Sequence, residues 1–468
     1  MRNVTRVRGV SRGVLISICL LFASHVMAEL PTYRVQDLGT LGGRITHASD
    51  LNESGQVTGY SETADGQLRA FLYRDGQMQA LGTLGGAGSL GNALNDAGQV
   101  TGFSVTTSGS TRAFIYVAGS MTDLGPPGSD SIGNDISNLG RVAGYSIRAD
   151  GSTRAFRHAA GIAGDLGATA DLGSFATAIN EADEVAGTYH DATGSHAFLH
   201  GPRGRRDLVP GRVSSIFGTH SLNDAGQVTG SFEVRGVTRA FLFENGRAND
   251  IGGLGGNYSY GYGLNAAGDV TGVSDTATGL RHAFIYSAGS VRDLGTLGGP
   301  VSFGYAINRS KQVAGEATVA AGGYHAFVYS RGRMLDLGVA VEQLTRSGFI
   351  ESVAYDINDA GQVIGRYYLP DAADPSQVRF RGFIATPIAL LIESLLAQVN
   401  GVGPGKSLAN KVNLLRRFYL AQDKASTCAS LKVLNRELMA LEGKKLPRAS
   451  SRALQKNVSG IAAAIACP

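Results

Sequence analysis

The sequence predicts a mainly β protein, an eight-bladed β-propeller of four-stranded blades closed by the N-terminal strand, followed by a small all-α domain. Three short blocks recur together, roughly 43 residues apart, over most of the chain. Repeats of about 40 to 45 residues with four short strands each are typical of propeller blades. Beyond residue 386 the apolar residues change to helical spacing. We therefore expect two domains, a propeller over 29–386 and an α-helical domain over 387–468.

The first 28 residues have the pattern of a secretory signal peptide. A basic start is followed by an apolar run from Val14 to Ala23 and by small residues at Val26 and Ala28. The run is too short to span a bilayer, and we expect cleavage after Ala28. The alternative is an uncleaved N-terminal anchor. The leader predicts a secreted or periplasmic protein, with no transmembrane segment after cleavage.

The repeats are defined by three blocks with a fixed order. The first block, a small residue followed by Leu or Ile and Asn, ends at Asn52, Asn95, Asn180, Asn223, Asn265, Asn308 and Asn358, with Asn138 assigned to the missing place. The second block, Arg or His followed by Ala and Phe, places Phe at 71, 114, 156, 198, 241, 284 and 327, and Phe383 ends the series. The third block is Asp-Leu-Gly or a close variant. Turn residues separate β-branched stretches, so each unit is predicted as four strands.

The two ends of the series predict how the ring closes. The last unit stops after its third strand, at 383–385, whereas the chain begins with an orphan fourth strand at 33–38. Pairing of these two segments would complete an eighth blade and cover an open edge. Seven blades with a loose end is the alternative.

The repeats resemble a known family. His196-Ala197-Phe198, His282-Ala283-Phe284 and His325-Ala326-Phe327 are similar to the motif of the HAF-repeat extracellular bacterial proteins, and the resemblance covers 33–385. It implies export and repeat architecture but no activity. The stretch from Leu434 to Leu446 resembles FIMAH domains, small helical domains at the C-termini of bacterial extracellular proteins, which also imply no established chemistry.

The C-terminal domain is predicted as four helices, at about 387–398, 406–421, 427–442 and 450–465. Residues 387–468 hold 12 Lys and Arg against 4 acids, a balance of +8, whereas 29–386 has a balance of −8. Cys428 lies near the start of the third helix and Cys467 just beyond the fourth. Consecutive helices joined by a short connection run antiparallel, so we expect a disulfide between these two cysteines.

The chain offers no recognisable catalytic, cofactor or metal motif. Gly401–Ser407 is similar to a phosphate-binding loop, but Asn400 stands where that loop needs Gly. A basic residue precedes every Ala-Phe or Gly-Phe pair, at Arg69, Arg112, Arg154, His196, Arg239, His282, His325 and Arg381. These residues either form an anion-binding ring or pair with polar groups such as the Asp of the Asp-Leu-Gly block, and the strand period favours pairing.

Features that occur once are better candidates for binding than features that occur eight times. The last unit has two longer loops, one before its first strand and one between its second and third, both at the same end of the ring. The candidate ligand-binding residues from these loops and their flanks are Glu342, Arg346, Glu351, Tyr367, Asp371, Asp374 and Arg379. Tyr258, Tyr260 and Tyr262 are further candidates, because they alternate on one face near that end.

These observations favour an exported, monomeric, non-catalytic interaction or scaffold protein that presents loops for a cell-envelope or extracellular protein or glycan. The alternative is a propeller enzyme, a hydrolase or lyase, that acts on a polysaccharide with acids from the long loops. We expect no cofactor, and no nucleic-acid partner because the propeller is acidic.

Overall fold

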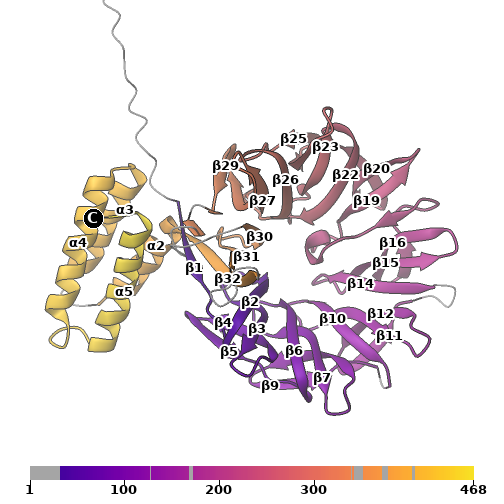
Figure 1. Cartoon of the computed structure of the whole chain (residues 1–468), viewed down its shortest axis with the longest axis horizontal. Coiled ribbons are helices and arrows are strands. Elements are labelled where there is room, and N and C mark those ends of the chain that lie inside the picture. The colour runs from indigo at the N-terminus through magenta and orange to yellow at the C-terminus, as the bar shows by residue number, and fades with distance from the viewer. Residues whose placement is uncertain are drawn as a thin grey trace, which may run out of the picture.

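The computed structural model describes residues 32–126, 128–167, 172–338, 340–341, 351–370, 378–402 and 406–467. The protein is mainly β, with four C-terminal helices (Figure 1). Antiparallel four-stranded sheets of the kind found in propeller blades are arranged around a common centre, and the helices lie to one side of them. Two such units, β18–β21 and β22–β25, are joined into one eight-stranded sheet by a parallel bridge between Thr238 and Tyr258. The expected mainly β fold with a helical C-terminus is confirmed. The signal-peptide prediction falls outside the described residues.

The strands follow one another sheet by sheet along the chain. The first three sheets are β2 (Gly42–Leu51), β3 (Val57–Thr63), β4 (Leu68–Arg74) and β5 (Gln77–Ala80); β6 (Gly85–Leu94), β7 (Val100–Thr106), β8 (Thr111–Val117) and β9 (Ser120–Asp123); and β10 (Asp130–Ile136), β11 (Val142–Ile147), β12 (Thr153–Ala159) and β13 (Ile162–Asp165). The next strands are β14 (Gly173–Ile179), β15 (Val185–Asp191), β16 (Gly194–Gly201) and β17 (Gly204–Asp207); then β18 (Ser214–Ser215), β19 (Val228–Val234), β20 (Val237–Glu244) and β21 (Arg247–Gly252). The remaining strands are β22 (Gly255–Leu264), β23 (Val270–Thr276), β24 (Arg281–Ser287) and β25 (Ser290–Asp293); β26 (Gly298–Ile307), β27 (Val313–Val319), β28 (Tyr324–Ser330) and β29 (Arg333–Asp336); and β30 (Ser352–Ile357), β31 (Val363–Pro370), β32 (Val378–Pro387) and β1 (Tyr33–Asp37).

The core lies between neighbouring sheets. The Phe of each Ala-Phe or Gly-Phe pair is fully buried, because alternate residues of its strand face the adjoining sheet. The second strand of a sheet carries a Gly where the first strand lies too close for a side chain. A Cβ on Gly315, for example, would lie 1.9 Å from the carbonyl oxygen of Phe303. The first strand of most sheets also has a shift in its pairing register near its end, for example between Ala48 and Asp50 in β2. This bulge re-aims the side chains next to it.

The repeated Asn links each sheet to the next. Asn95 Nδ2 donates to the carbonyl oxygen of Ser137, 3.0 Å away, and Asn95 Oδ1 accepts from the amide of Gln99. Asn52, Asn180, Asn223, Asn265, Asn308 and Asn358 donate in the same way to the following repeat. The assignment of Asn138 to this series is wrong, because Ser137 holds the equivalent position. Asn138 belongs one residue later, where its side chain accepts from the amide of Asp96.

The first and last strands of the β region lie side by side. Strand β1 pairs antiparallel with β32, so that Tyr33 is opposite Pro387 and Asp37 is opposite Phe383. At the inner end of the same sheet, Asn358 Nδ2 donates to the carbonyl oxygen of Asn52, 3.0 Å away. The chain leaves β32 at Pro387, at the end of the sheet opposite Glu351, whose carbonyl oxygen accepts from Tyr368.

The basic residue of the second block is a structural partner in at least four repeats. Arg112, His282, His325 and Arg381 contact the carboxylates of Asp123, Asp293, Asp336 and Asp37, with distances of 2.9, 2.8, 2.9 and 3.1 Å. The interpretation as partners of the Asp-Leu-Gly block is confirmed for these four pairs. Such pairing fixes the outer strand of a sheet to its neighbour.

The C-terminal helices are α2 (Ile388–Val399), α3 (Ser407–Leu420), α4 (Lys424–Leu441) and α5 (Arg448–Ala464). They form one apolar core that includes Ile392, Leu415, Leu434 and Val458. The predicted disulfide is confirmed: Cys428 and Cys467 are bonded, with Cα atoms 5.5 Å apart. Of the helices in the described part of the chain, none combines the length and the apolar composition that crossing a membrane requires.

Candidate functional site

The candidate tyrosines lie on β22, next to β23 in its sheet. Tyr260 and Tyr262 are half-buried and their rings stack, with centroids 6.4 Å apart and planes 11° apart. Both rings also contact Phe217 edge-on, at 5.6 and 6.1 Å. Tyr258 is 41% exposed. The structure thus brings Tyr260 and Tyr262 into one aromatic group, with Tyr258 exposed two residues earlier.

The other candidates are divided between described and undescribed residues. Glu342, Arg346, Asp371 and Asp374 lie outside the described residues. Glu351 and Arg379 are half-buried at the ends of strands that lead into the two long loops.

Tyr367 differs from the other described candidates in its burial. It is only 2% exposed, and its hydroxyl donates to Asp37 Oδ2, 2.7 Å away. Its ring belongs to the core of the last sheet, so it offers no surface to a ligand.

Two charged residues that were not among the candidates occupy a position that repeats eight times. This position follows the Gly that recurs in the second strand of every repeat. It is mostly aromatic, aliphatic or a small hydroxyl residue: Tyr60, Phe103, Tyr145, Thr188, Ser231, Val273, Glu316 and Arg366. Glu316 lies on β27 and Arg366 on β31, in adjacent sheets. Aligning the repeats on Val-x-Gly shows these two exceptions directly, so this signal was available in the sequence.

Arg366 is surrounded by aromatic rings. Its guanidinium carbon lies 5.5 Å from the ring centroid of Tyr355, 5.0 Å from that of Tyr368 and 5.4 Å from that of Phe380. A guanidinium within about 6 Å of a ring face is attracted to it. The rings hold the positive charge in place, and Nε of Arg366 is buried without a hydrogen-bond partner among the described residues.

Glu316 is the acidic counterpart in the neighbouring sheet. The hydroxyl of Tyr305 donates to its Oε1, 2.8 Å away. Burial raises the pKa of Glu316; the Tyr305 hydrogen bond opposes this, the charge of Glu351 adds to it, and Arg366 opposes it. The carboxyl group therefore takes up a proton more readily than an exposed glutamate does.

His47 completes the group from the first sheet. Its ring lies 5.1 Å from Tyr60, 5.2 Å from Tyr355 and 6.4 Å from Phe380. Burial, reinforced by the charge of Arg366, lowers its pKa to about 4, so the imidazole is neutral at physiological pH. Its buried Nδ1 has no hydrogen-bond partner in the described part of the chain.

We call these residues the Glu316–Arg366 cluster, which consists of His47, Tyr60, Tyr305, Glu316, Tyr355, Arg366, Tyr368 and Phe380. All are half-buried, so each presents part of its surface to solvent. Tyr305 connects the cluster to the candidate tyrosines, because its ring lies 5.9 Å from that of Tyr262. Aromatic side chains therefore run from Phe217 to Tyr60 across adjacent sheets, with one cation and one carboxyl group among them.

A second polar group lines a cavity of about 250 Å³ near the inner ends of the sheets. Asp50, His220 and Asp356 each place a possible ligand atom within 4.8 Å of the others, and Asp135 lines the same cavity. This donor set could hold a divalent cation. His220 comes from a short 3-10 helix (Thr219–Ser221) that interrupts its repeat, which explains why the repeat pattern did not indicate it.

Comparisons with known proteins find only distant similarity to solved structures. No family model and no curated protein matches the chain. A puromycin-hydrolysing peptidase of Mycobacterium tuberculosis is similar over 73% of this chain, with 12% identity and a TM-score of 0.42; the chain covers 61% of its length. The β-propeller domain of the Trilobed protease of Pyrococcus furiosus is similar over 55% of this chain and 86% of its own, with 10% identity and a TM-score of 0.38. TolB of Acinetobacter baumannii is similar over 60% of this chain and 78% of its own, with 12% identity and a TM-score of 0.33.

Proposed function

We propose that this chain is an exported, non-catalytic β-propeller of the HAF-repeat type that binds an extracellular glycan at the Glu316–Arg366 cluster. Eight blades closed into a ring are part of the proposal. The pairing of β1 with β32 and the hydrogen bond from Asn358 to Asn52 support closure. The disulfide is in keeping with an oxidising compartment.

The observation that carries the proposal is Arg366 held among three half-buried rings. A sugar ring has an apolar face, which packs on aromatic side chains, and hydroxyl groups, which need donors and acceptors. The cluster holds both kinds of group, because Tyr355 and Tyr305 are half-buried aromatic side chains while Arg366 and Glu316 carry polar groups. These residues belong to rigid strands, so little conformational entropy is lost when a ligand binds.

The test is a glycan and peptide array probed with the mature protein, followed by affinity measurement on the glycans that bind. Arg366→Ala should weaken binding by at least about tenfold, which corresponds to about 1.4 kcal/mol. Tyr145→Ala is the matched control, because Tyr145 holds the equivalent position in a distant repeat and lies against Phe175. It should change the affinity less than about twofold.

Equal losses in the two variants would contradict the proposal, since the binding surface would then not be centred on Arg366. Binding only to peptides on the array would also contradict it. Circular dichroism of both variants checks that the fold is retained.

A second candidate function is favoured by one observation. Burial, with a smaller contribution from the charge of Glu351 outside the cluster, raises the pKa of Glu316, and a glutamate with a raised pKa suits a general acid. This arrangement would serve a polysaccharide-cleaving enzyme. New reducing ends or unsaturated products from a bound glycan, lost in Glu316→Gln, would favour this function over pure binding.

A further inference from the structure

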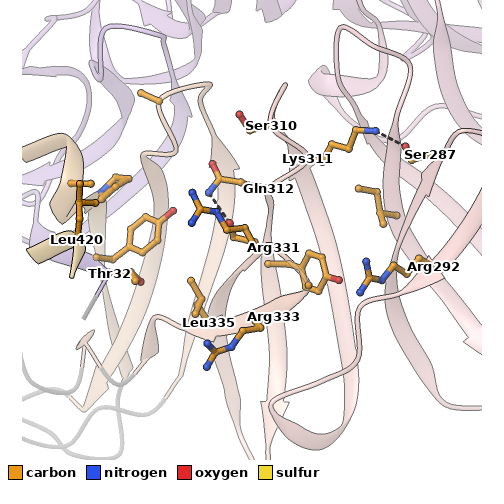
Figure 2. Close-up of a pocket in the computed structure, with 18 of the residues that line it drawn as sticks. Thr32, Ser287, Arg292, Ser310, Lys311, Gln312, Arg331, Arg333, Leu335 and Leu420 are labelled. Carbon is orange, nitrogen blue, oxygen red and sulfur yellow. Dashed lines mark hydrogen bonds between the residues drawn. The ribbon is translucent and has the colours of Figure 1, made fainter. Parts of the chain in front are cut away.

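A second surface lies where the sheets meet the helices. A groove of about 970 Å³ separates the turns of the seventh repeat from the start of β1 and the end of α3 (Figure 2). We call it the junction groove. Its floor includes Tyr33, Tyr329 and Tyr419, each 5 or 6% exposed.

The junction groove is strongly cationic. Four exposed basic residues line it, Arg292, Lys311, Arg331 and Arg333, together with Ser287, Ser290, Ser310 and Ser330. Among the described residues that line it, none is Asp or Glu. Figure 2 shows the basic side chains on neighbouring turns around the same space. Asp269 offsets part of this charge, because its Oδ1 lies 3.2 Å from Lys311 Nζ.

Two of the four cations break the repeat pattern. Lys311 is the only lysine before residue 400, and it holds the turn position that is Gly in six repeats, at 55, 98, 140, 226, 268 and 361. Its φ is +61°, in the left-handed region that favours glycine. Arg331 has a φ of +51° in a hairpin turn where Ala118, Ala160 and Ala288 hold the equivalent place. Lys311 thus places a cation where six repeats have glycine, and Arg331 places one where three others have alanine, so both charges are additions to the repeat pattern beside one groove.

The helical domain forms the other side of the groove with uncharged residues. Residues 387–468 have a balance of +8, and the loop after α3 reaches the groove through Leu420 and Gln422. The β region as a whole, 29–386, has a balance of −8 even with the four groove cations counted, so an anionic polymer would be repelled elsewhere and attracted here.

We propose that the junction groove binds a segment of an anionic polysaccharide through Arg292, Lys311, Arg331 and Arg333. A single polysaccharide chain can enter a concave groove and reach all four cations. Anionic lipid vesicles and DNA offer the same charge, and the test below includes them as competing outcomes. This site is separate from the Glu316–Arg366 cluster, and the two together would let one molecule join two carbohydrate surfaces.

The test measures binding of the full mature chain to polygalacturonate, with uncharged dextran as the reference polymer. The double variant Lys311→Gly, Arg331→Ala places in the seventh repeat the residues that other repeats already have, so the fold should be retained. Its affinity for polygalacturonate should fall at least about tenfold, and the affinity of the unchanged protein should fall steeply as salt is added. Arg235→Ala is the control, because Arg235 also has a left-handed φ, of +51°, in a turn outside the groove.

Four results would overturn the proposal. They are unchanged affinity in the double variant, an equal loss in Arg235→Ala, binding to dextran as tight as to polygalacturonate, and binding only to anionic lipid vesicles or to DNA. Arg366→Ala separates the two sites: it should leave polygalacturonate binding intact, and a loss in that variant would assign the polymer to the Glu316–Arg366 cluster instead.

Discussion

Replacing Asn358 by Ala should destabilise the propeller as strongly as the same change at an interior repeat. The Asn358 side chain donates to the carbonyl oxygen of Asn52 at 3.0 Å and to Gln362 Oε1 at 3.0 Å, and it accepts from the amide of Gln362 at 2.9 Å. It is 3% exposed, so water does not replace these bonds. At about 1 kcal/mol net per hydrogen bond, three lost bonds amount to about 2 to 4 kcal/mol.

The assay is urea unfolding, monitored by circular dichroism, of three single variants. Asn95→Ala is the interior reference, because Asn95 makes the same three bonds to Ser137 and Gln99. Ser137→Ala is the negative control, since its buried hydroxyl has no partner among the described residues and its removal should cost less than about 0.5 kcal/mol. If Asn358→Ala behaves like Ser137→Ala while Asn95→Ala is destabilised, the ring is not closed between the last and first repeats.

Two further predictions concern the helices and the axial cavity. Reduction of the Cys428–Cys467 bond, which spans 39 residues, should lower the stability of the helical domain by about 4 kcal/mol on a chain-entropy estimate, as measured by thermal melting of the helical signal with and without reductant; an unchanged melt would contradict it. Burial, with a contribution from Asp356, raises the pKa of Asp50 to about 7, and burial raises that of Asp135 to about 6. The folded state therefore holds these protons more tightly than the unfolded chain, and the urea midpoint should rise as the pH falls from about 8 to about 6. The Asp50→Asn, Asp135→Asn variant should lose most of this rise and exposed Asp65→Asn should keep it; a rise of equal size in both variants would refute the assignment.

The fold could be predicted from the repeats, because each block has the same structural role in nearly every repeat. The buried Phe and the Asn turn recur at fixed spacing, so strand order and the β1–β32 pairing followed from counting units. The error at Asn138 came from the same reasoning: identity of residue type was taken as identity of position. The backbone contact from Asn95 places Ser137 there instead.

The candidate site was predicted only in part, because its residues are brought together from different sheets. Tyr260 and Tyr262 were visible as neighbours in the sequence, whereas Arg366 and Tyr355 became partners only through the pairing of β30 with β31. Asp50 and Asp356 are more than 300 positions apart, and His220 joins them from the 3-10 helix of a third repeat. No local pattern carries such proximity. Comparison of equivalent positions among repeats would have exposed Glu316 and Arg366, and it is the most useful procedure for chains of this kind.

The pairing of β1 with β32 also determines how long the first strand remains unpaired during synthesis. Asp37 and Arg381, which form an ion pair in the last sheet, are 344 positions apart. At roughly 5 to 20 residues per second, the first strand waits about 17 to 70 s for its partner to be made. During that interval its edge is open to other chains, which is a hazard for any unpaired strand. Among the strand pairs of the described residues, this one therefore waits longest for its second member to be made.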